Sequence, residues 1–245
     1  DLAAPVAEGE DRAAYKARAV LAGDDKAKLE ALASTLGDVV KKVRRTPEEP
    51  LYMQDLADLY AERLHSLKDA EEYYKRIKLA DPKSVRMLRF YCKYYEQASD
   101  WQRMLSSLQT LKNAVSGSYR ELNVSREIAR ISEDKLNNPG KAVNVWNQLL
   151  KDNLFTDVAR EELIGLYIRT QKWQALLEIY KNDMEALGED KVGERIAILR
   201  KCIDIYDNQL HLDAMVIKMY HQILAIDPNN DEAVNALIER YEASK

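Results

Sequence analysis

Apolar residues recur at helical spacing along almost the whole chain, and no stretch shows the sustained period of two that is typical of a β-strand. Turn signals separate segments of about 12–18 residues, which is the length of ordinary helices. The clearest of these signals are Asp81-Pro82, Asn137-Asn138-Pro139-Gly140 and Asp227-Pro228-Asn229-Asn230. The pattern predicts an all-α fold.

The chain repeats itself through columns of equivalent residues. The first column is mostly aromatic and recurs every 35–39 residues: Tyr60, Tyr95, Ser132, Tyr167, Tyr206 and Tyr241. A second column lies four residues earlier, on the same helical face: Leu56, Tyr91, Ile128, Leu163, Cys202 and Leu237. A third column follows the first by 13 or 14 residues: Tyr74, Leu108, Trp146, Tyr180 and Tyr220. Each unit is therefore predicted to be two antiparallel amphipathic helices joined by a short turn.

The 13- and 14-residue spacings alternate, so that the first, third and fifth units carry one extra residue. The second helix of each even unit begins with a tryptophan, Trp101 or Trp173, six residues after the column tyrosine. The same rule places the next tryptophan two positions beyond Lys245. This favours a section of a longer array, and the alternative is a native end at which the last helix covers the final apolar face.

These columns resemble the tetratricopeptide (TPR) repeat family. The resemblance rests on Leu163, Tyr167 and Trp173 in one unit, and on Ala70-x3-Tyr74 followed by the turn Asp81-Pro82 in another. It covers residues 50–245, and it departs from the family where the usual small residue is Ile164, Ile203 or Ile238. The resemblance implies an all-α, right-handed superhelical α-solenoid whose first helices line a concave, peptide-binding groove.

Two segments of the chain are distinguished by their regularity. Residues 50–245 are predicted to form five helix pairs, at about 50–82, 83–118, 119–155, 156–190 and 191–230, followed by a single helix at 231–245. Residues 1–49 are less regular. Helices are expected at 13–21 and 26–36, with a break at Gly37-Asp38 before residues 39–45. A degenerate capping unit is favoured over a mobile arm, because Ala, Leu and Val still mark one face.

Composition and charge narrow the functional classes. The chain is 46% hydrophobic and 32% charged, which suits a packed fold rather than disorder. Its net charge of −4 and pI near 5.6 argue against nucleic-acid binding, and an RNA-binding α-solenoid is kept only as a minor alternative. No apolar run approaches the ~18 residues that a spanning helix needs, so membrane insertion is not expected.

The residue types used in catalysis and metal binding do not form motifs. Cys92 and Cys202 are isolated and read as small buried hydrophobes. Two unpaired thiols fit a reducing compartment, which favours the cytoplasm. His65, His211 and His221 form no ligand set, and neither a nucleophile elbow nor a phosphate-binding loop occurs. We therefore expect no enzyme activity, metal or cofactor.

Basic residues are predicted on the exposed side of the first helices, opposite the column residues. They are Arg86, Arg89, Lys93, Arg126, Arg130, Arg169 and Arg200, with Gln54 and Asp58 at one end and Glu232, Asn235 and Glu239 at the other. Residues 83–151 carry a net charge of +6, between flanks of −3 and −7. Such a middle section should attract an anionic segment.

Three interpretations of this basic strip follow. The leading one is a protein-interaction scaffold that binds an acidic partner segment in the groove, through arginines that can grip a carboxylate with two hydrogen bonds. The second is a structural section of a longer array that self-associates. The third is a solvated face with local ion pairs such as Arg130–Asp134. The Lys/Asn clamp of chaperone-binding TPR proteins is not matched, because the corresponding positions hold Arg89, Lys93, Arg126 and Arg130.

Overall fold

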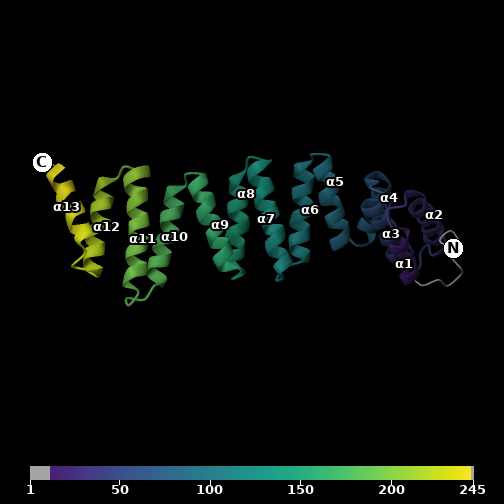
Figure 1. The fold of residues 1–245 in the computed structure, drawn as a ribbon, viewed down its shortest axis with the longest axis horizontal. Coiled ribbons are helices and arrows are strands. Elements are labelled where there is room, and N and C mark those ends of the chain that lie inside the picture. Colours follow the sequence, from purple (N-terminus) through teal and green to yellow (C-terminus); the bar gives the residue numbers. More distant parts are fainter. Residues whose placement is uncertain (1–11, 244–245) are drawn as a thin grey trace. The chain divides into compact units, whose positions relative to one another are not determined.

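The computed structural model describes residues 12–243, and this part of the chain is helical with no strand. The chain divides into two compact units, Asp1–Ala142 and Val143–Lys245, and each is described by itself. The helices follow one another in the order shown in Figure 1: α1 (Arg12–Ala22), α2 (Lys26–Lys42), α3 (Glu49–Asp58), η1 (Leu59–Arg63), α4 (Leu67–Ala80), α5 (Val85–Gln97), α6 (Trp101–Ala114), α7 (Tyr119–Asp134), α8 (Pro139–Lys151), α9 (Thr156–Arg169), α10 (Trp173–Ala186), α11 (Val192–Asp204), η2 (Ile205–Gln209), α12 (Asp213–Ile226) and α13 (Asp231–Ala243). No described helix has the length and apolar character that crossing a bilayer requires.

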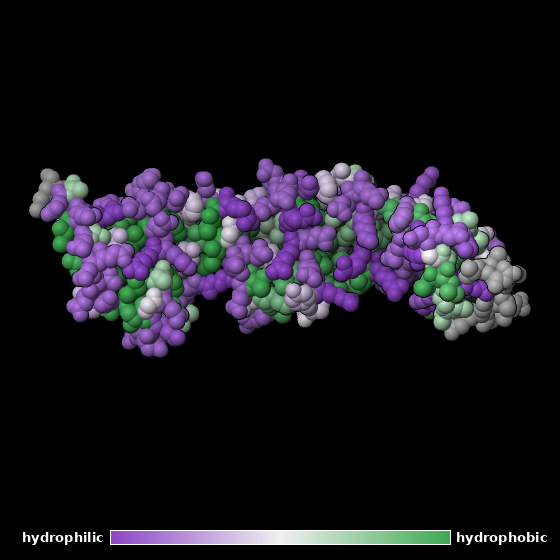
Figure 2. All heavy atoms as spheres, viewed as in Figure 1, coloured by the Kyte–Doolittle hydropathy of each residue, from purple (hydrophilic) through white to green (hydrophobic). Residues whose placement is uncertain are grey.

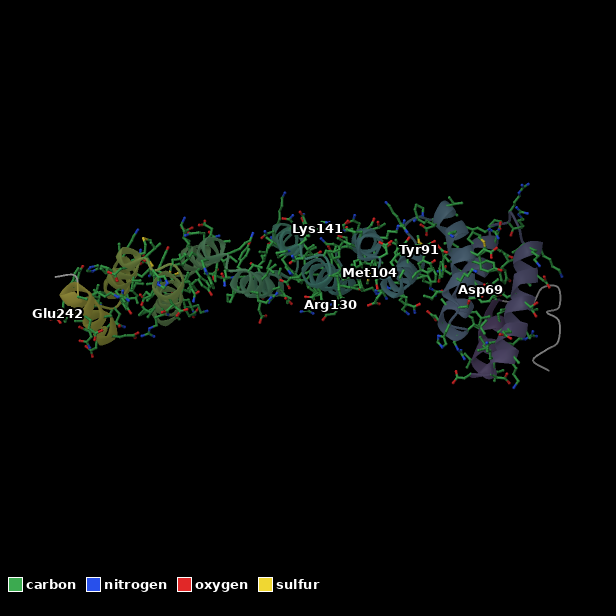
Figure 3. All side chains as sticks on the ribbon, turned by 90° about the horizontal axis from the view of Figure 1, so that it is seen from above. Asp69, Tyr91, Met104, Arg130, Lys141 and Glu242 are labelled. Carbon is green, nitrogen blue, oxygen red and sulfur yellow. The ribbon has the colours of Figure 1, made fainter. Side chains whose placement is uncertain are left out.

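In the first unit, each helix packs against its neighbours in sequence, α3 on α4, α5 on α6 and α6 on α7. The repeat columns supply the core, because Leu56, Tyr91, Ile128, Tyr74 and Leu108 are all buried. Figure 3 shows Tyr91 and Met104 within the α5–α6 part of this unit. An aromatic cluster adds directional packing: the Tyr74 ring stacks on Phe90 at 4.3 Å between centroids.

In the second unit, α9 packs on α10, α11 on α12, and α12 on α13. The column residues Leu163, Cys202 and Leu237 are buried, as are Tyr180 and Val216 of the second helices. The tyrosine column is less uniform, since Tyr167 is buried, Tyr206 is half-buried and Tyr241 is 46% exposed. A tyrosine suits such positions because its ring packs while its hydroxyl reaches the rim.

The extra residue of the odd units is accommodated by a π-type turn at the end of the first helix. In these units the backbone N–H donates to a carbonyl five residues back: Leu64 to Leu59, Leu136 to Ile131 and Leu210 to Ile205. The next closing bond spans six residues: Ser66 to Tyr60, Asn138 to Ser132 and Leu212 to Tyr206. In the even units the corresponding bond spans only five: Asp100 to Tyr95 and Lys172 to Tyr167. A π-turn holds one residue more than the α-helical path, so it absorbs the insertion without disturbing the second helix.

The predicted break at Gly37-Asp38 is wrong. Helix α2 runs without interruption from Lys26 to Lys42, and Leu36 and Val40 are buried on one face of it. A Cβ atom built on Gly37 would lie 3.9 Å from the Leu56 side chain, so the helices approach closely at this glycine. Burial of the flanking apolar residues outweighs the ~1 kcal/mol that a glycine costs inside a helix.

Candidate partner-binding site

The first unit contains a cavity of about 750 Å³. Apolar side chains of α2, α5 and α6 form part of its wall, including Leu36, Phe90 and Leu108. Charged side chains of α1, α3, η1, α5 and α7 also line it. A cavity of this size falls within the range of ligand sites.

Three of the predicted basic residues line the cavity, and all three belong to α5. They are Arg86, Arg89 and Lys93, and each is exposed to solvent. Arg86 donates to Asp58 at 3.1 Å. Arg89 and Lys93 have no carboxylate oxygen within 4 Å of their side-chain nitrogens among the described residues. These two residues therefore leave positive charge at the cavity that the described residues do not neutralise by direct contact.

The other predicted basic residues do not line this cavity. Arg126 and Arg130 are exposed on α7, and Figure 3 shows Arg130 at the edge of the molecule. Arg169 and Arg200 are exposed in the second unit, where Arg200 forms an ion pair with Glu232 of α13. The structure thus brings together three of the seven predicted site residues.

Acidic residues are as numerous as basic ones around the cavity. The carboxylates are Asp55, Asp58, Glu62, Glu96 and Glu127, and the cations are Lys16, Arg63, Arg86, Arg89 and Lys93. Of these acids, only Asp58 was recognised from the sequence. The repeat register could have found two more, because Asp55 and Glu127 occupy equivalent positions directly before the column residues Leu56 and Ile128.

Asp58 joins three helices at the cavity wall. It accepts hydrogen bonds from the Tyr74 hydroxyl of α4 and from Arg86 of α5. Burial raises the pKa of the Asp58 carboxyl, and the Tyr74 hydrogen bond and the Arg86 charge oppose that rise. Burial and the adjacent Asp58 carboxylate both raise the pKa of Tyr74, which keeps its hydroxyl protonated as the donor.

Asp55 joins the N-terminal helix to α3. Arg12 donates two hydrogen bonds to its carboxylate, and Lys16 lies 3.8 Å from it. The Asp55 side chain is only 7% exposed, so this bidentate pair is largely shielded from water. Tyr15 of α1 and Tyr52 of α3 add an edge-to-face ring contact at 6.2 Å. Helix α1 is therefore an integral part of the wall that holds Lys16 beside the cavity.

Glu127 of α7 is half-buried at the cavity. Burial raises the pKa of its carboxyl, Glu96 raises it further, and the charges of Arg130 and Arg89 lower it. The folded protein therefore binds a proton at Glu127 more tightly than the unfolded chain does.

Glu127→Gln is expected to change how stability depends on pH. Well above both pKa values the carboxylate is ionised in either state, and the folded protein bears its desolvation cost. As the pH falls through the folded pKa towards the unfolded value near 4.3, the native state takes up the proton first and gains stability. The free energy of unfolding of Glu127→Gln should thus exceed that of the wild type at pH 7, and the difference should shrink towards pH 4. Denaturant titrations at several pH values measure it, and a constant difference would contradict this account.

The cavity lining includes the thiol of Cys92. Burial raises the pKa of the Cys92 thiol to about 12, so at neutral pH it is a protonated thiol rather than a nucleophilic thiolate. Within residues 12–243 no three His, Cys, Asp or Glu side chains are grouped so that they could hold a metal ion. The lining offers ion pairs, hydrogen bonds and apolar contacts to a ligand.

Comparisons with known proteins identify the fold. No protein-family model matches the sequence, and no curated protein is similar to it. The structure is similar to a chain in the structure of Naa15/Naa10 bound to HypK-THB, with a TM-score of 0.51 and 13% identity over 94% of this chain; the match spans only 39% of that chain.

Two further solved structures match at lower TM-scores. A tetratricopeptide repeat protein from Parabacteroides merdae ATCC 43184 matches at 0.49 (12% identity, 94% of this chain and 98% of that one). A chain of the APC/C hetero-tetramer Cut9-Hcn1 matches at 0.31 (14% identity, 94% and 49%). The helix pairs, the repeat columns and the first similarity together confirm the predicted all-α, TPR-like helical-repeat fold.

Proposed function

We propose that this protein is a non-enzymatic interaction scaffold, and that the cavity of its first unit binds a segment of a partner protein. The observation that carries the proposal is the pair Arg89 and Lys93. Both line a cavity of about 750 Å³, and no described carboxylate lies within 4 Å of their charged groups. Acidic side chains of the partner would form direct ion pairs with these two cations, and Arg126 and Arg130 on α7 are further exposed basic residues of this unit.

The charge arrangement supports an acidic segment whose carboxylate binds at α5. Asp55 and Asp58 already bind Arg12 and Arg86, so the α3 side of the cavity is largely neutralised. The cations that have no direct ion pair among the described residues, Arg89 and Lys93, lie on α5, one helical turn apart, where a carboxylate could accept from both. The apolar wall formed by Phe90 and Leu108 would take a neighbouring apolar side chain of the same segment.

The double substitution Arg89→Glu/Lys93→Glu is expected to weaken partner binding at least about tenfold, because two charge-assisted contacts become repulsive. Short random peptides displayed on phage would be selected against the purified protein, and the enriched peptides titrated by fluorescence anisotropy. We expect the enriched sequences to carry Asp or Glu beside an apolar residue, and their affinity to fall with added salt.

A matched control is Arg44→Glu/Arg120→Glu, which makes the same charge change at two exposed residues outside the cavity. This control should keep the wild-type affinity, and both double variants should keep the helical circular dichroism spectrum. Equal affinities for the wild type and the Arg89→Glu/Lys93→Glu variant would overturn the assignment of this site.

A further inference from the structure

Glu127 is a half-buried carboxylate of the cavity wall that has no direct partner. It lines the cavity from α7, and among the described residues no cation lies within 4 Å of its carboxylate and no group donates a hydrogen bond to it. Asp55 and Asp58 line the same cavity, and each is held by an arginine. Burying a carboxylate costs free energy unless an opposite charge or a hydrogen bond compensates it. At Glu127 the folded chain leaves this compensation incomplete.

Glu96 of α5 is a second carboxylate close to Glu127. It also lines the cavity, is exposed to solvent, and has no described cation within 4 Å of its carboxylate. Besides burial, the charges of Glu127 and Glu96 raise the pKa of the Cys92 thiol, so both carboxylates lie near this one side chain. Like charges that lie this close repel each other, and a cation bound beside both would relieve the repulsion.

Two arginines act on Glu127 without touching it. Burial raises the pKa of the Glu127 carboxyl and Glu96 raises it further, whereas the charges of Arg130 on α7 and Arg89 on α5 lower it without bringing it back to its ordinary value. Arg130 is exposed, and Figure 3 shows it at the edge of the molecule. Since neither arginine contacts the carboxylate, a closer cation would still be favourable.

The charges that line the cavity change sign along α5. Four charged residues on one face of this helix line it, at intervals of three, four and three residues: Arg86, Arg89, Lys93 and Glu96. Arg86 already pairs with Asp58. Figure 2 shows mainly hydrophilic side chains on the viewed face over α5, α6 and α7, which Figure 1 locates. A segment that runs along α5 thus meets two cations and then the carboxylates of Glu96 and Glu127.

We propose that Glu127, together with Glu96, binds a basic side chain of the partner segment whose acidic side chain binds Arg89 and Lys93. This inference rests on the proposed function and specifies its ligand. Five residues of α5 separate Glu96 from the midpoint of Arg89 and Lys93, which is about 7.5 Å along the helix. In an extended segment, side chains two positions apart point the same way and lie about 6.6 Å apart. The segment therefore carries its basic residue two positions from its acidic one.

Peptide selection tests this charge pattern. A library of short random peptides on phage would be selected against the wild type and, in parallel, against Glu127→Lys. The wild type should enrich peptides with Lys or Arg two positions from Asp or Glu, and Glu127→Lys should enrich peptides that lack the basic residue. Asp134→Lys is the matched control, since it introduces a lysine for an acid at an exposed position of α7 outside the cavity. It should select the same peptides as the wild type.

The affinity of an enriched peptide tests the contact itself. In anisotropy titrations, Glu127→Gln should weaken binding at least about fivefold, because it removes one charge of an ion pair. Replacing the basic residue of the peptide by glutamine should weaken binding by a similar factor. The two changes together should cost little more than either alone, since they remove the same interaction. Circular dichroism checks that each variant is folded.

The pH dependence of binding has a sign that a merely repulsive Glu127 would not give. A bound cation favours the ionised carboxylate, so the pKa of Glu127 is lower in the complex than in the free protein, and binding releases protons. The affinity advantage of the wild type over Glu127→Gln should therefore shrink as the pH falls through the pKa of the free protein. Glu96 and Asp58 titrate in both proteins, so the comparison removes their contributions. If Glu127 only repelled an acidic segment, Glu127→Gln would bind more tightly than the wild type at neutral pH.

Enriched peptides without a basic residue, or equal or tighter binding by Glu127→Gln, would overturn this inference. The double variant Arg89→Glu/Lys93→Glu separates that result from a failure of the proposed function. If the double variant still weakens binding, the site stands and only the role of Glu127 is lost. If it binds as the wild type does, or if no peptide is enriched, both proposals fail.

Discussion

Tyr74→Ala is expected to lower the free energy of unfolding by about 3–5 kcal/mol, the range found when a buried aromatic side chain is truncated to alanine. Tyr74 is 1% exposed and its ring stacks on Phe90 across the α4–α5 contact. Truncation would open a cavity at this contact and would also remove the hydroxyl that donates to Asp58. The half-buried Asp58 carboxylate would then keep only Arg86 as its partner at this wall.

Chemical denaturation followed by circular dichroism measures this loss. Tyr74→Phe separates the two contributions, since it keeps the ring and should cost only about 1–2 kcal/mol for the lost hydrogen bond. Leu79→Ala controls for the helix itself, because Leu79 lies on the same helix and is 88% exposed. A loss below about 1 kcal/mol for Tyr74→Ala would show that the α4–α5 contact is not the core that the burial indicates.

Ser132→Tyr is expected to destabilise the protein by about 2–3 kcal/mol, although tyrosine is the commonest residue of its column. Ser132 is completely buried, and its hydroxyl has no hydrogen-bond partner among the described residues. Four of the five tyrosines of the column, Tyr60, Tyr95, Tyr206 and Tyr241, keep part of their side chain at the surface, and Tyr167 is buried. At position 132 the ring would have to enter a closed site, which forces neighbouring side chains from their preferred rotamers.

Ser132→Ala provides the opposite result at the same position. It removes a buried hydroxyl without a partner and creates almost no cavity, so we expect a gain of about 0.5–1 kcal/mol. Melting curves of the three proteins should therefore rank alanine above serine and serine above tyrosine. If the tyrosine variant were the most stable, the column would reflect a packing rule that holds at this position as well.

The repeat columns account for most of what could be predicted about the fold. The first and second columns lie four residues apart, so in every first helix they mark the same face. An apolar face that recurs in this way is expected to be the buried one, and Leu56, Ile128 and Leu163 are buried. The extra residue of the odd units was also visible in the spacing. Its form was not, because an insertion can lengthen a loop or widen a helix, and only the backbone hydrogen bonds from Leu64 and Leu210 distinguish a π-turn from a longer loop.

The prediction of a break at Gly37 was wrong because it considered only neighbouring residues in the sequence. Glycine lowers the stability of a helix by a small local amount. The packing of α2 on α3, where Leu56 lies next to Gly37, outweighs that loss. Propensity is a property of a few neighbouring residues, whereas the contact that outweighs it comes from the next helix.

Within the candidate site, the sequence by itself determined which side chains face outward from each first helix. Arg86, Arg89 and Lys93 are exposed because they lie opposite a buried stripe, and this follows from helical periodicity alone. Only the tertiary structure decided which charges meet. Asp58 pairs with Arg86 from another helix, and Glu127 approaches the same cavity from α7. Electrostatic neutralisation depends on distances between helices, and these are set by packing rather than by spacing along the chain.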